Sequence, residues 1–388
     1  MTSRDDGHEV TSRDDGHEVT SRDDGREGAS RDDGRDVTAP GEGRAATVPA
    51  GGRPVSVQVV VEAPGAHRLA PHTPRDPGPG EALVAVHAVG VCGSDREVYQ
   101  GNRPEGYVRY PLTPGHEWSG TVRAVGPGAR GDLVGRKVVG EGFRNCQVCD
   151  HCHAGETTLC GAGYEETGFT QPGAMAPTLT LPARLLHVLP EAADLTAAAL
   201  LEPAACVAAA ALKAGARPGE RVAVVGTGTL GMLAVRFLKA VSPAELLVVG
   251  ARDDRAALAR RFGATAFRTK DEKLPGGFDV VVEAAGSADS ARTAAALCRR
   301  GGRLVLTGLP AAGAAGLDPT DLVVRQLEVH TVFGAPPSAW AHAVRMFAAG
   351  LLDPLPLVTH ELPLTDFAHA VDLVGGGDPK VGKVLLRP

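Results

Sequence analysis

Apolar side chains recur with two different periods along this chain of 388 residues. Residues 55–63 and 81–93 are rich in β-branched side chains with a period of two, which predicts strands, whereas the Ala-rich segment near 194–214 predicts a helix. Loops are expected over 101–114 and 141–173, and short mixed elements from about residue 335 onwards.

Between these segments, short apolar runs alternate with longer amphipathic ones. Strands are predicted at residues 221–226, 245–251, 278–286 and 301–309, and the intervening helices are expected to end near residues 240, 262 and 299. Regular alternation of strand and helix predicts an α/β fold with a parallel, doubly wound sheet.

A nine-residue repeat occupies the N-terminal 37 residues. TSRDDGHEV stands at 2–10 and again at 11–19, and related copies follow at 20–28 and 29–37. The copies hold almost no apolar side chains to offset the entropy of ordering, so we expect a disordered repeat tail and linker over residues 1–54. Weak calcium binding by the paired aspartates is the alternative interpretation.

Composition and charge narrow the class of protein further. With 43% hydrophobic residues, 4% aromatic residues and 50 glycines, the chain fits an α/β protein better than a β-sandwich or a coiled coil. It has no uncharged apolar run long enough for a membrane span and no signal-peptide core at its start, so we expect a cytoplasmic protein. The net charge of −6 lies entirely in residues 1–37, and this argues against non-specific nucleic-acid binding.

Four of the seven cysteines are packed into one short segment. They have the spacing C-x2-C-x2-C-x7-C and are Cys146, Cys149, Cys152 and Cys160. Such spacing lets one loop wrap four sulfurs around an ion, and four thiolates are the usual shell of a structural zinc. A disulfide cluster conflicts with the cytosolic character of the chain, and an iron–sulfur cluster lacks its usual following proline. Cys206 and Cys298 are expected to be small core residues.

A glycine-rich turn marks a nucleotide-binding site. Gly226, Gly228 and Gly231 directly follow a predicted strand and open a predicted helix, with Thr229 and Leu230 between the last two glycines. Glycines in this pattern permit the tight turn and the close approach of a pyrophosphate, which the helix N-terminus then holds.

The next predicted strand bears on the choice of cofactor. Gly250 stands where NAD enzymes place an acid for the ribose hydroxyls, and Arg252 and Arg255 follow it. Arginines at this point favour a 2′-phosphate, and therefore NADP over NAD. In the alternative, Asp253 reaches the ribose and NAD is the cofactor.

Taken together, these motifs resemble the zinc-dependent medium-chain dehydrogenase/reductase superfamily over residues 55–388. Besides the glycine turn and the four-cysteine lobe, the matching segments are VCGSD (91–95), PGHEWSG (114–120), LLEP (200–203), DVVVEAAG (279–286), GGRLVLTG (301–308) and VGKVLL (381–386). The resemblance implies a GroES-like, mainly β catalytic domain that is split in the sequence. Its parts would be residues 55–203, with a zinc lobe at 141–173, and residues 335–388, on either side of a Rossmann domain at 204–334. It also implies a catalytic zinc in the cleft between the domains, a small-molecule substrate and a homodimer or homotetramer.

The resemblance further assigns roles by position. Cys92 and His116 would be ligands of the catalytic zinc, Asp95 would accept the second ring proton of His116, and either Glu117 or Glu202 would be the third ligand. Ser94 would relay the proton of the substrate. Many relatives carry a histidine where this chain has Glu97, so the relay ends at Glu97 or at water. A catalytic zinc would lower the pKa of the substrate hydroxyl, and hydride would pass from the carbinol carbon to the nicotinamide.

The substrate is indicated by a narrower resemblance. Residues 91–101, 110–122 and 131–140 are most similar to 2-deoxy-scyllo-inosamine dehydrogenases, which act on an aminocyclitol in aminoglycoside antibiotic assembly. We therefore expect a cyclic polyol or amino-polyol, with other polyol, sugar or threonine-type alcohols as alternatives. A zinc-free reductase or a structural relative is the second class, and the intact Cys92, His116 and Glu202 argue against it.

Overall fold

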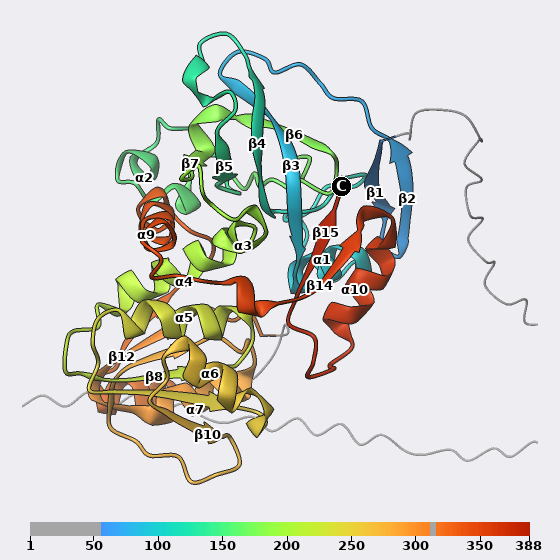
Figure 1. The fold of residues 1–388 in the computed structure, drawn as a ribbon. Helices are drawn as coiled ribbons and strands as arrows, with labels where there is room; N and C mark the ends of the chain where they lie inside the picture. The colour runs from blue at the N-terminus through green and yellow to red at the C-terminus, as the bar shows by residue number, and fades with distance from the viewer. Residues whose placement is uncertain (1–55, 311–315) are drawn as a thin grey trace, which may run out of the picture. The chain divides into compact units, whose positions relative to one another are not determined.

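Two large β-sheets of different topology organise the described residues, 56–310 and 316–388, in the computed structural model (Figure 1). The repeat tail and linker predicted for residues 1–54 lie outside the described residues. No helix in the described part of the chain is long and apolar enough to cross a membrane.

The first sheet has seven strands in a mainly antiparallel arrangement, in the order β14-β15-β3-β4-β5-β7, with β6 paired to β3. Its strands are β3 (Glu81–Val91), β4 (Glu117–Val125), β5 (Lys137–Gly140), β6 (Thr178–Pro182), β7 (Leu186–Val188), β14 (Val358–Pro363) and β15 (Lys383–Arg387). A separate hairpin is formed by β1 (Val57–Ala63) and β2 (Ala66–Pro71). In Figure 1 the red β15 lies beside the blue β3, so segments from far apart in the sequence complete one sheet.

The second sheet has six parallel strands in the order β10-β9-β8-β11-β12-β13. These are β8 (Arg221–Val225), β9 (Glu245–Gly250), β10 (Ala266–Thr269), β11 (Phe278–Glu283), β12 (Cys298–Leu306) and β13 (Glu328–Thr331). The chain runs outward from β8 to β10 and then returns to β11, which makes the junction of β8 and β11 the switch point of a doubly wound fold. The predicted fold class is confirmed, although β10 and β13 were not among the predicted strands. The exact domain boundaries stay predictions.

Helix α4 (Leu201–Ala214) packs between the two sheets and contacts strands of both. Its buried face is mostly alanine, and Ala204, Ala205, Ala208 and Ala210 are fully buried. Small side chains let the helix approach both sheets closely, so a single core runs from Ala88 and Val139 in the first sheet to the strands of the second. The helix thereby carries its first turn into the space between the sheets.

The remaining helices surround this framework. Around the second sheet lie α5 (Thr229–Lys239), α6 (Ala256–Phe262), α7 (Ala288–Leu297) and α8 (Pro319–Arg325). The others are α1 (Gly93–Gln100), α2 (Asp150–His153), α3 (Leu195–Ala198), α9 (Pro337–Ala348) and α10 (Phe367–Gly375). Short 3-10 turns are η1 (Gly131–Leu133), η2 (Thr157–Leu159), η3 (Ala183–Leu185), η4 (Asp253–Arg255), η5 (Leu355–Leu357) and η6 (Leu364–Asp366). Cys298 is buried, as predicted.

Candidate active site and metal centres

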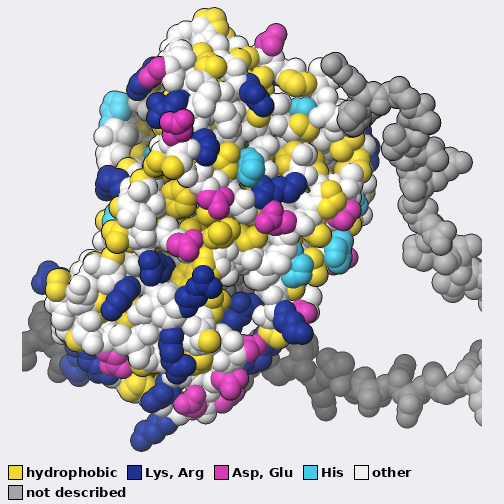
Figure 2. Space-filling model, in the orientation of Figure 1, with side chains coloured by type: hydrophobic (Ala, Val, Ile, Leu, Met, Phe, Trp, Pro, Cys, Tyr) yellow, Lys and Arg dark blue, Asp and Glu magenta, His cyan; other side chains and the backbone are white. Residues whose placement is uncertain are grey.

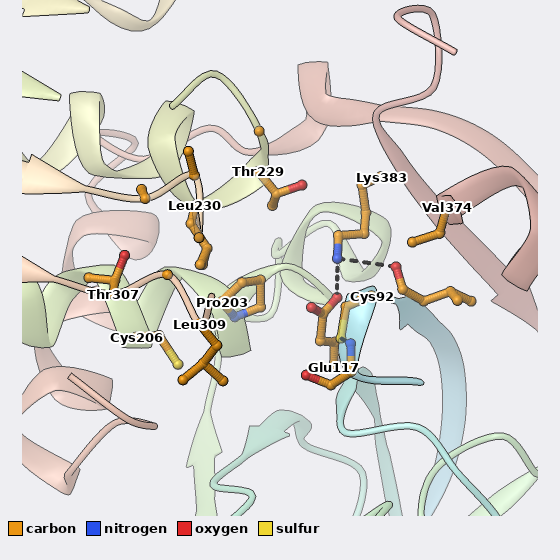
Figure 3. A pocket seen from close by; sticks show the side chains of 18 of the residues that line it. Cys92, Glu117, Pro203, Cys206, Thr229, Leu230, Thr307, Leu309, Val374 and Lys383 are labelled. Atoms are coloured by element: carbon orange, nitrogen blue, oxygen red, sulfur yellow. Dashed lines mark hydrogen bonds and ion pairs between the residues drawn. The ribbon is translucent and has the colours of Figure 1, made fainter. Parts of the chain in front are cut away.

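A cavity of about 630 Å³ lies between the two sheets. Cys92, just after β3, and His116, just before β4, line it together with Glu202 and Cys206 of α4. The loops after the strands of the second sheet close the other side, with Thr307 and Leu309 among their residues (Figure 3). A cavity that joins a possible metal site to the switch point of a doubly wound sheet is the expected location for chemistry on a nucleotide cofactor.

The metal-ligand candidates converge because β3 and β4 are antiparallel neighbours. Gly90 pairs with Glu117, so the residue that follows β3 lies next to the start of β4. Cys92 Sγ is 3.3 Å from His116 Nε2, and the ligand atoms of Cys92, His116 and Glu117 all lie within 4.8 Å of one another. Sulfur, imidazole and carboxylate donors in one compact group fit a zinc ion.

Asp95 lies beside the histidine of this group. Its Oδ2 accepts the backbone N–H of Cys92 (3.0 Å), and its Oδ1 lies 3.7 Å from His116 Nδ1, which leaves Nε2 facing Cys92. Burial lowers the pKa of His116, but the negative charges of Cys92 and Asp95 outweigh burial and raise this pKa well above its ordinary value. The site therefore favours an added positive charge, which a bound cation supplies.

Glu117 and Glu202, the two candidates for the third ligand, lie at different distances from the Cys92 and His116 pair. Glu117 belongs to the compact group, and its Oε2 accepts a hydrogen bond from Lys383 Nζ (2.6 Å; dashed in Figure 3). Glu202 lines the same cavity but lies outside the group, where its Oε1 accepts the thiol of Cys206 (3.5 Å). Burial raises the pKa of Glu202 to about 7. Glu117 is thus the better placed of the two carboxylates.

The proposed proton relay starts on α1. Ser94 and Glu97 both line the cavity, but no hydrogen bond among the described residues joins their side chains. Glu97 instead forms an ion pair with Arg103 (3.6 Å), and its side chain is 42% exposed. The relay from Ser94 to Glu97 stays a prediction.

The glycine turn lies at the carboxyl ends of the parallel strands, with Thr229 and Leu230 in the cavity lining. Gly226 has φ +122°, and a Cβ there would lie 2.8 Å from the carbonyl carbon of Ala284. A Cβ on Gly231 would lie 2.1 Å from the carbonyl oxygen of Gly226. The first and third glycines therefore permit the tight turn and the close packing of α5, while Gly228 caps the helix and leaves open space for a phosphate.

The four-cysteine lobe forms a second compact donor group. The sulfurs of Cys146, Cys149, Cys152 and Cys160 lie within 4.8 Å of one another, and all four thiols are free. The Gly161 N–H donates to Cys149 Sγ (3.4 Å) and, with other donors, lowers the pKa of this thiol to about 6. Backbone N–H groups that stabilise thiolates fit a tetrahedral metal shell with four sulfur ligands.

Comparisons with known proteins match both halves of this architecture. Residues 78–191 match the alcohol dehydrogenase GroES-like domain, and residues 229–349 match the zinc-binding dehydrogenase family. The chain is 30% identical over 337 residues to L-threonine 3-dehydrogenase of Coxiella burnetii, which covers 84% of this chain and 96% of the relative. The chain belongs to the zinc-dependent medium-chain dehydrogenase/reductase superfamily.

A second curated relative and a solved structure also match most of this chain. A 2-dehydro-3-deoxy-L-galactonate 5-dehydrogenase of Pseudoalteromonas atlantica is 31% identical over 332 residues, which are 83% of this chain and 94% of the relative. A zinc-binding dehydrogenase from Sinorhizobium meliloti bound to NADP superposes with a TM-score of 0.80 at 26% identity, over 87% of this chain and 100% of that one. This chain is accordingly an NAD(P)-dependent zinc alcohol or polyol dehydrogenase.

The dehydrogenase has no room for an acid at the end of β9. A Cβ on Gly250 would lie 2.8 Å from Phe267 Cζ and 2.9 Å from Thr227 Cγ2. Arg252 and Arg255 line the cavity; Arg252 pairs with Asp254 (3.2 Å), and Arg255 donates to the carbonyl oxygen of Val381 (2.9 Å). Lys and Arg side chains are also numerous on the face over the second sheet (Figure 2).

Three residues at or beside the cavity of the dehydrogenase received no site role in the sequence analysis. Lys383 is buried against Glu117, and only its place in the matched segment 381–386 could have drawn attention to it. Glu283 is buried at the end of β11, where its carboxylate accepts the N–H groups of Ala285 and Gly286. Cys206 packs against the core as predicted, but it also lines the cavity (Figure 3).

Proposed function

We propose that this dehydrogenase interconverts a secondary alcohol and a ketone on a cyclic polyol or amino-polyol, with NADP favoured over NAD. The oxidation moves a hydride from the carbinol carbon to the nicotinamide and releases the hydroxyl proton. The observation that carries the proposal is the compact group of Cys92, His116 and Glu117, which shares one cavity with the nucleotide turn.

The residues of this cavity have separate roles in the proposed reaction. Cys92 and His116, with Glu117 or Glu202, would hold a zinc ion, which as a Lewis acid lowers the pKa of the substrate hydroxyl. Asp95 keeps the imidazole of His116 oriented. Ser94 accepts the hydroxyl proton and passes it to Glu97 or to water at the open side of the cavity. The glycine turn holds the pyrophosphate of the cofactor.

The aminocyclitol is the favoured substrate because residues 91–101, 110–122 and 131–140 resemble 2-deoxy-scyllo-inosamine dehydrogenases. The names of the relatives support the coarser class. L-threonine carries an amine, and 2-dehydro-3-deoxy-L-galactonate is a polyhydroxy acid. A threonine-type or open-chain polyol substrate is the alternative.

The decisive experiment combines metal analysis with turnover. The purified protein is expected to contain two zinc ions per chain and to oxidise polyols or amino-polyols with NADP. Cys92→Ser and His116→Ala should each lose about one zinc and nearly all turnover, whereas the fold, followed by circular dichroism, stays intact. One zinc per chain in the wild type, or unchanged activity in both variants, would contradict the assignment and favour a zinc-free relative.

We also propose a homodimer or homotetramer. β13 is the outer strand of the second sheet, and exposed Val329 on this strand lies close in the chain to exposed Val323 and Val324 of α8. An open strand edge with apolar side chains beside it is typical of a self-association surface. Light scattering should give at least twice the chain mass, and Val329→Lys should lower it; a monomeric wild type contradicts the proposal.

A further inference from the structure

Glu166 is a buried carboxylate in the cavity that the proposed reaction leaves unused. Its side chain is only 6% exposed, yet it belongs to the cavity lining. The Oε2 atom accepts the hydroxyl of Tyr164 and lies 3.9 Å from an Arg103 nitrogen. The Oε1 atom accepts no hydrogen bond from any described residue. This oxygen is therefore free to accept a hydrogen bond from a ligand in the cavity.

The backbone around Glu166 holds the carboxylate in place. Its carbonyl oxygen accepts the N–H groups of Phe169, Thr170 and Gln171, and its own N–H donates to Thr170 Oγ1 (2.8 Å). A Cβ on Gly142 would lie 3.0 Å from Glu166 Oε1, so the glycine leaves space beside the free oxygen. The group is therefore rigid before any ligand arrives, which reduces the entropy cost of binding.

Arg103 links Glu166 to the rim and to the metal-ligand group. It forms the ion pair with Glu97, donates to Tyr164 Oη (3.0 Å), and lies 3.9 Å above the ring of Phe169. The ring of Phe169 also packs against His116, with ring centroids 4.7 Å apart. One aromatic ring thus separates the guanidinium from a zinc-ligand candidate, and Glu166 lines the same cavity as that candidate.

The charge balance of this subsite is negative. Among the described residues, the carboxylates of Glu97 and Glu166 both pair with Arg103, so two acids share one guanidinium; burial raises the pKa of Glu166, and an ammonium group beside it would favour the charged form. The adjoining wall is aromatic, because Phe143 and Phe333 also line the cavity and contact Tyr164. Aromatic faces pack on the C–H faces of a ring and attract an ammonium group, and they strengthen an ion pair by excluding water.

We propose that Glu166 is a specificity-determining residue that receives the ammonium group of an amino-polyol substrate. The inference rests on the proposed function, because it assumes that the reacting hydroxyl lies at Cys92 and His116. Arg103 and Tyr164 act as positioning residues that hold the carboxylate. The same subsite disfavours phosphorylated and carboxylated polyols, because Arg103 is already engaged by two carboxylates.

The test compares scyllo-inosamine with scyllo-inositol, which differ by an amine in place of one hydroxyl. Binding of each compound to the complex of enzyme and NADP is measured by calorimetry, and turnover is measured in parallel. A hydrogen bond between charged groups corresponds to a preference of about 10- to 100-fold for the amine. Glu166→Gln keeps the shape of the side chain and should abolish this preference. The Kd and KM of scyllo-inosamine should rise, whereas those of scyllo-inositol should stay unchanged.

The matched control is Glu165→Gln, which removes an equal charge from the neighbouring side chain, 46% exposed and paired with Arg109, and should change the preference less than about threefold, as expected for exposed ion pairs. Tyr164→Phe keeps the charge but removes a donor from Oε2, and it should reduce the preference to an intermediate value. In wild-type enzyme, the ratio of the two affinities should fall about tenfold per pH unit above the pKa of the amine. Titration of protein groups near both compounds, among them His116 and Tyr164, changes both affinities and therefore largely drops out of their ratio.

The outcomes separate this inference from the proposed function. Equal binding of the two compounds by the wild type, or a preference that survives in Glu166→Gln, overturns the inference while polyol turnover still supports the function. If neither compound is oxidised, the proposed substrate class fails, and the binding preference alone decides whether Glu166 recognises an amine. The wild-type pH series provides that decision even if Glu166→Gln does not fold.

Discussion

Replacement of Glu283 tests whether one buried carboxylate holds the cofactor side of the cavity together. Its Oε1 accepts three hydrogen bonds, from Ala285 N (2.7 Å), Gly286 N (2.8 Å) and Ser290 Oγ (2.7 Å), and its Oε2 accepts one from Gly308 N (3.3 Å). The donors belong to the segments that follow β11 and β12, and both segments line the cavity. We therefore expect Glu283 to affect stability and cofactor binding together.

The magnitude follows from these contacts. Hydrogen bonds to a charged group each contribute about 1.5–3 kcal/mol, roughly twice a neutral one. Glu283→Gln retains one acceptor oxygen but directs an amide N–H at another donor, so we expect a loss of about 2–4 kcal/mol. Glu283→Ala leaves buried donors without an acceptor and should cost at least as much, near the upper limit for single substitutions.

Urea unfolding with an unchanged m-value measures the loss, and quenching or enhancement of NADPH fluorescence measures cofactor affinity. Asp279→Asn is the matched control, because Asp279 lies on the same strand and pairs with the half-exposed Arg299 (2.7 Å). A partly exposed ion pair contributes at most about 1 kcal/mol. The reasoning is refuted if Glu283→Gln costs no more than the control and binds the cofactor as the wild type does.

Three further predictions concern metals, cofactor and pH. Cys149→Ser should release one zinc and lower the midpoint of unfolding while the second zinc remains, because structural zinc binding is coupled to folding. Metal analysis and a melting curve measure the two effects, and a variant that melts like the wild type contradicts the prediction. Arg252→Ala should raise the KM for NADP about tenfold more than the KM for NAD in steady-state assays, since it removes a charged phosphate contact; equal effects contradict it. In metal-free protein, burial raises the pKa of Glu202 from the ordinary 4.5 to about 7, so the free energy of unfolding should fall by up to about 3 kcal/mol between pH 4.5 and 7. Glu202→Gln should lack this fall in urea titrations across the same pH range.

The parts of the site that could be predicted are those encoded locally. The glycine turn is contiguous in the sequence, and its strand and helix are long enough to show their periods. The four cysteines also form one short segment. Cys92 and His116 were assigned by resemblance, and the pairing of β3 with β4 accounts for their approach.

The parts that were missed depend on contacts between distant segments. Lys383 reaches Glu117 across 266 residues of sequence, and no local pattern predicts that pair. Arg103 and Glu166 lie in loops, where neither helical nor strand periodicity marks a buried face. Cys206 lies in an Ala-rich helix whose sequence predicts a buried core element. The sequence does not show that the first turns of α4 line a cavity.

The late addition of β15 to the first sheet has a consequence for biosynthesis. Lys383 follows Val91 by 292 residues, which at ribosomal speeds of about 5–20 residues per second corresponds to roughly 15–60 s of translation. During this interval the nascent chain exposes the edge of β3 that β15 later covers, and Glu117 lacks its buried partner. The strands of the second sheet are contiguous in the sequence and can fold within that interval. Slow elongation therefore prolongs an aggregation-prone state, and chaperones that shield strand edges should raise the yield of active enzyme.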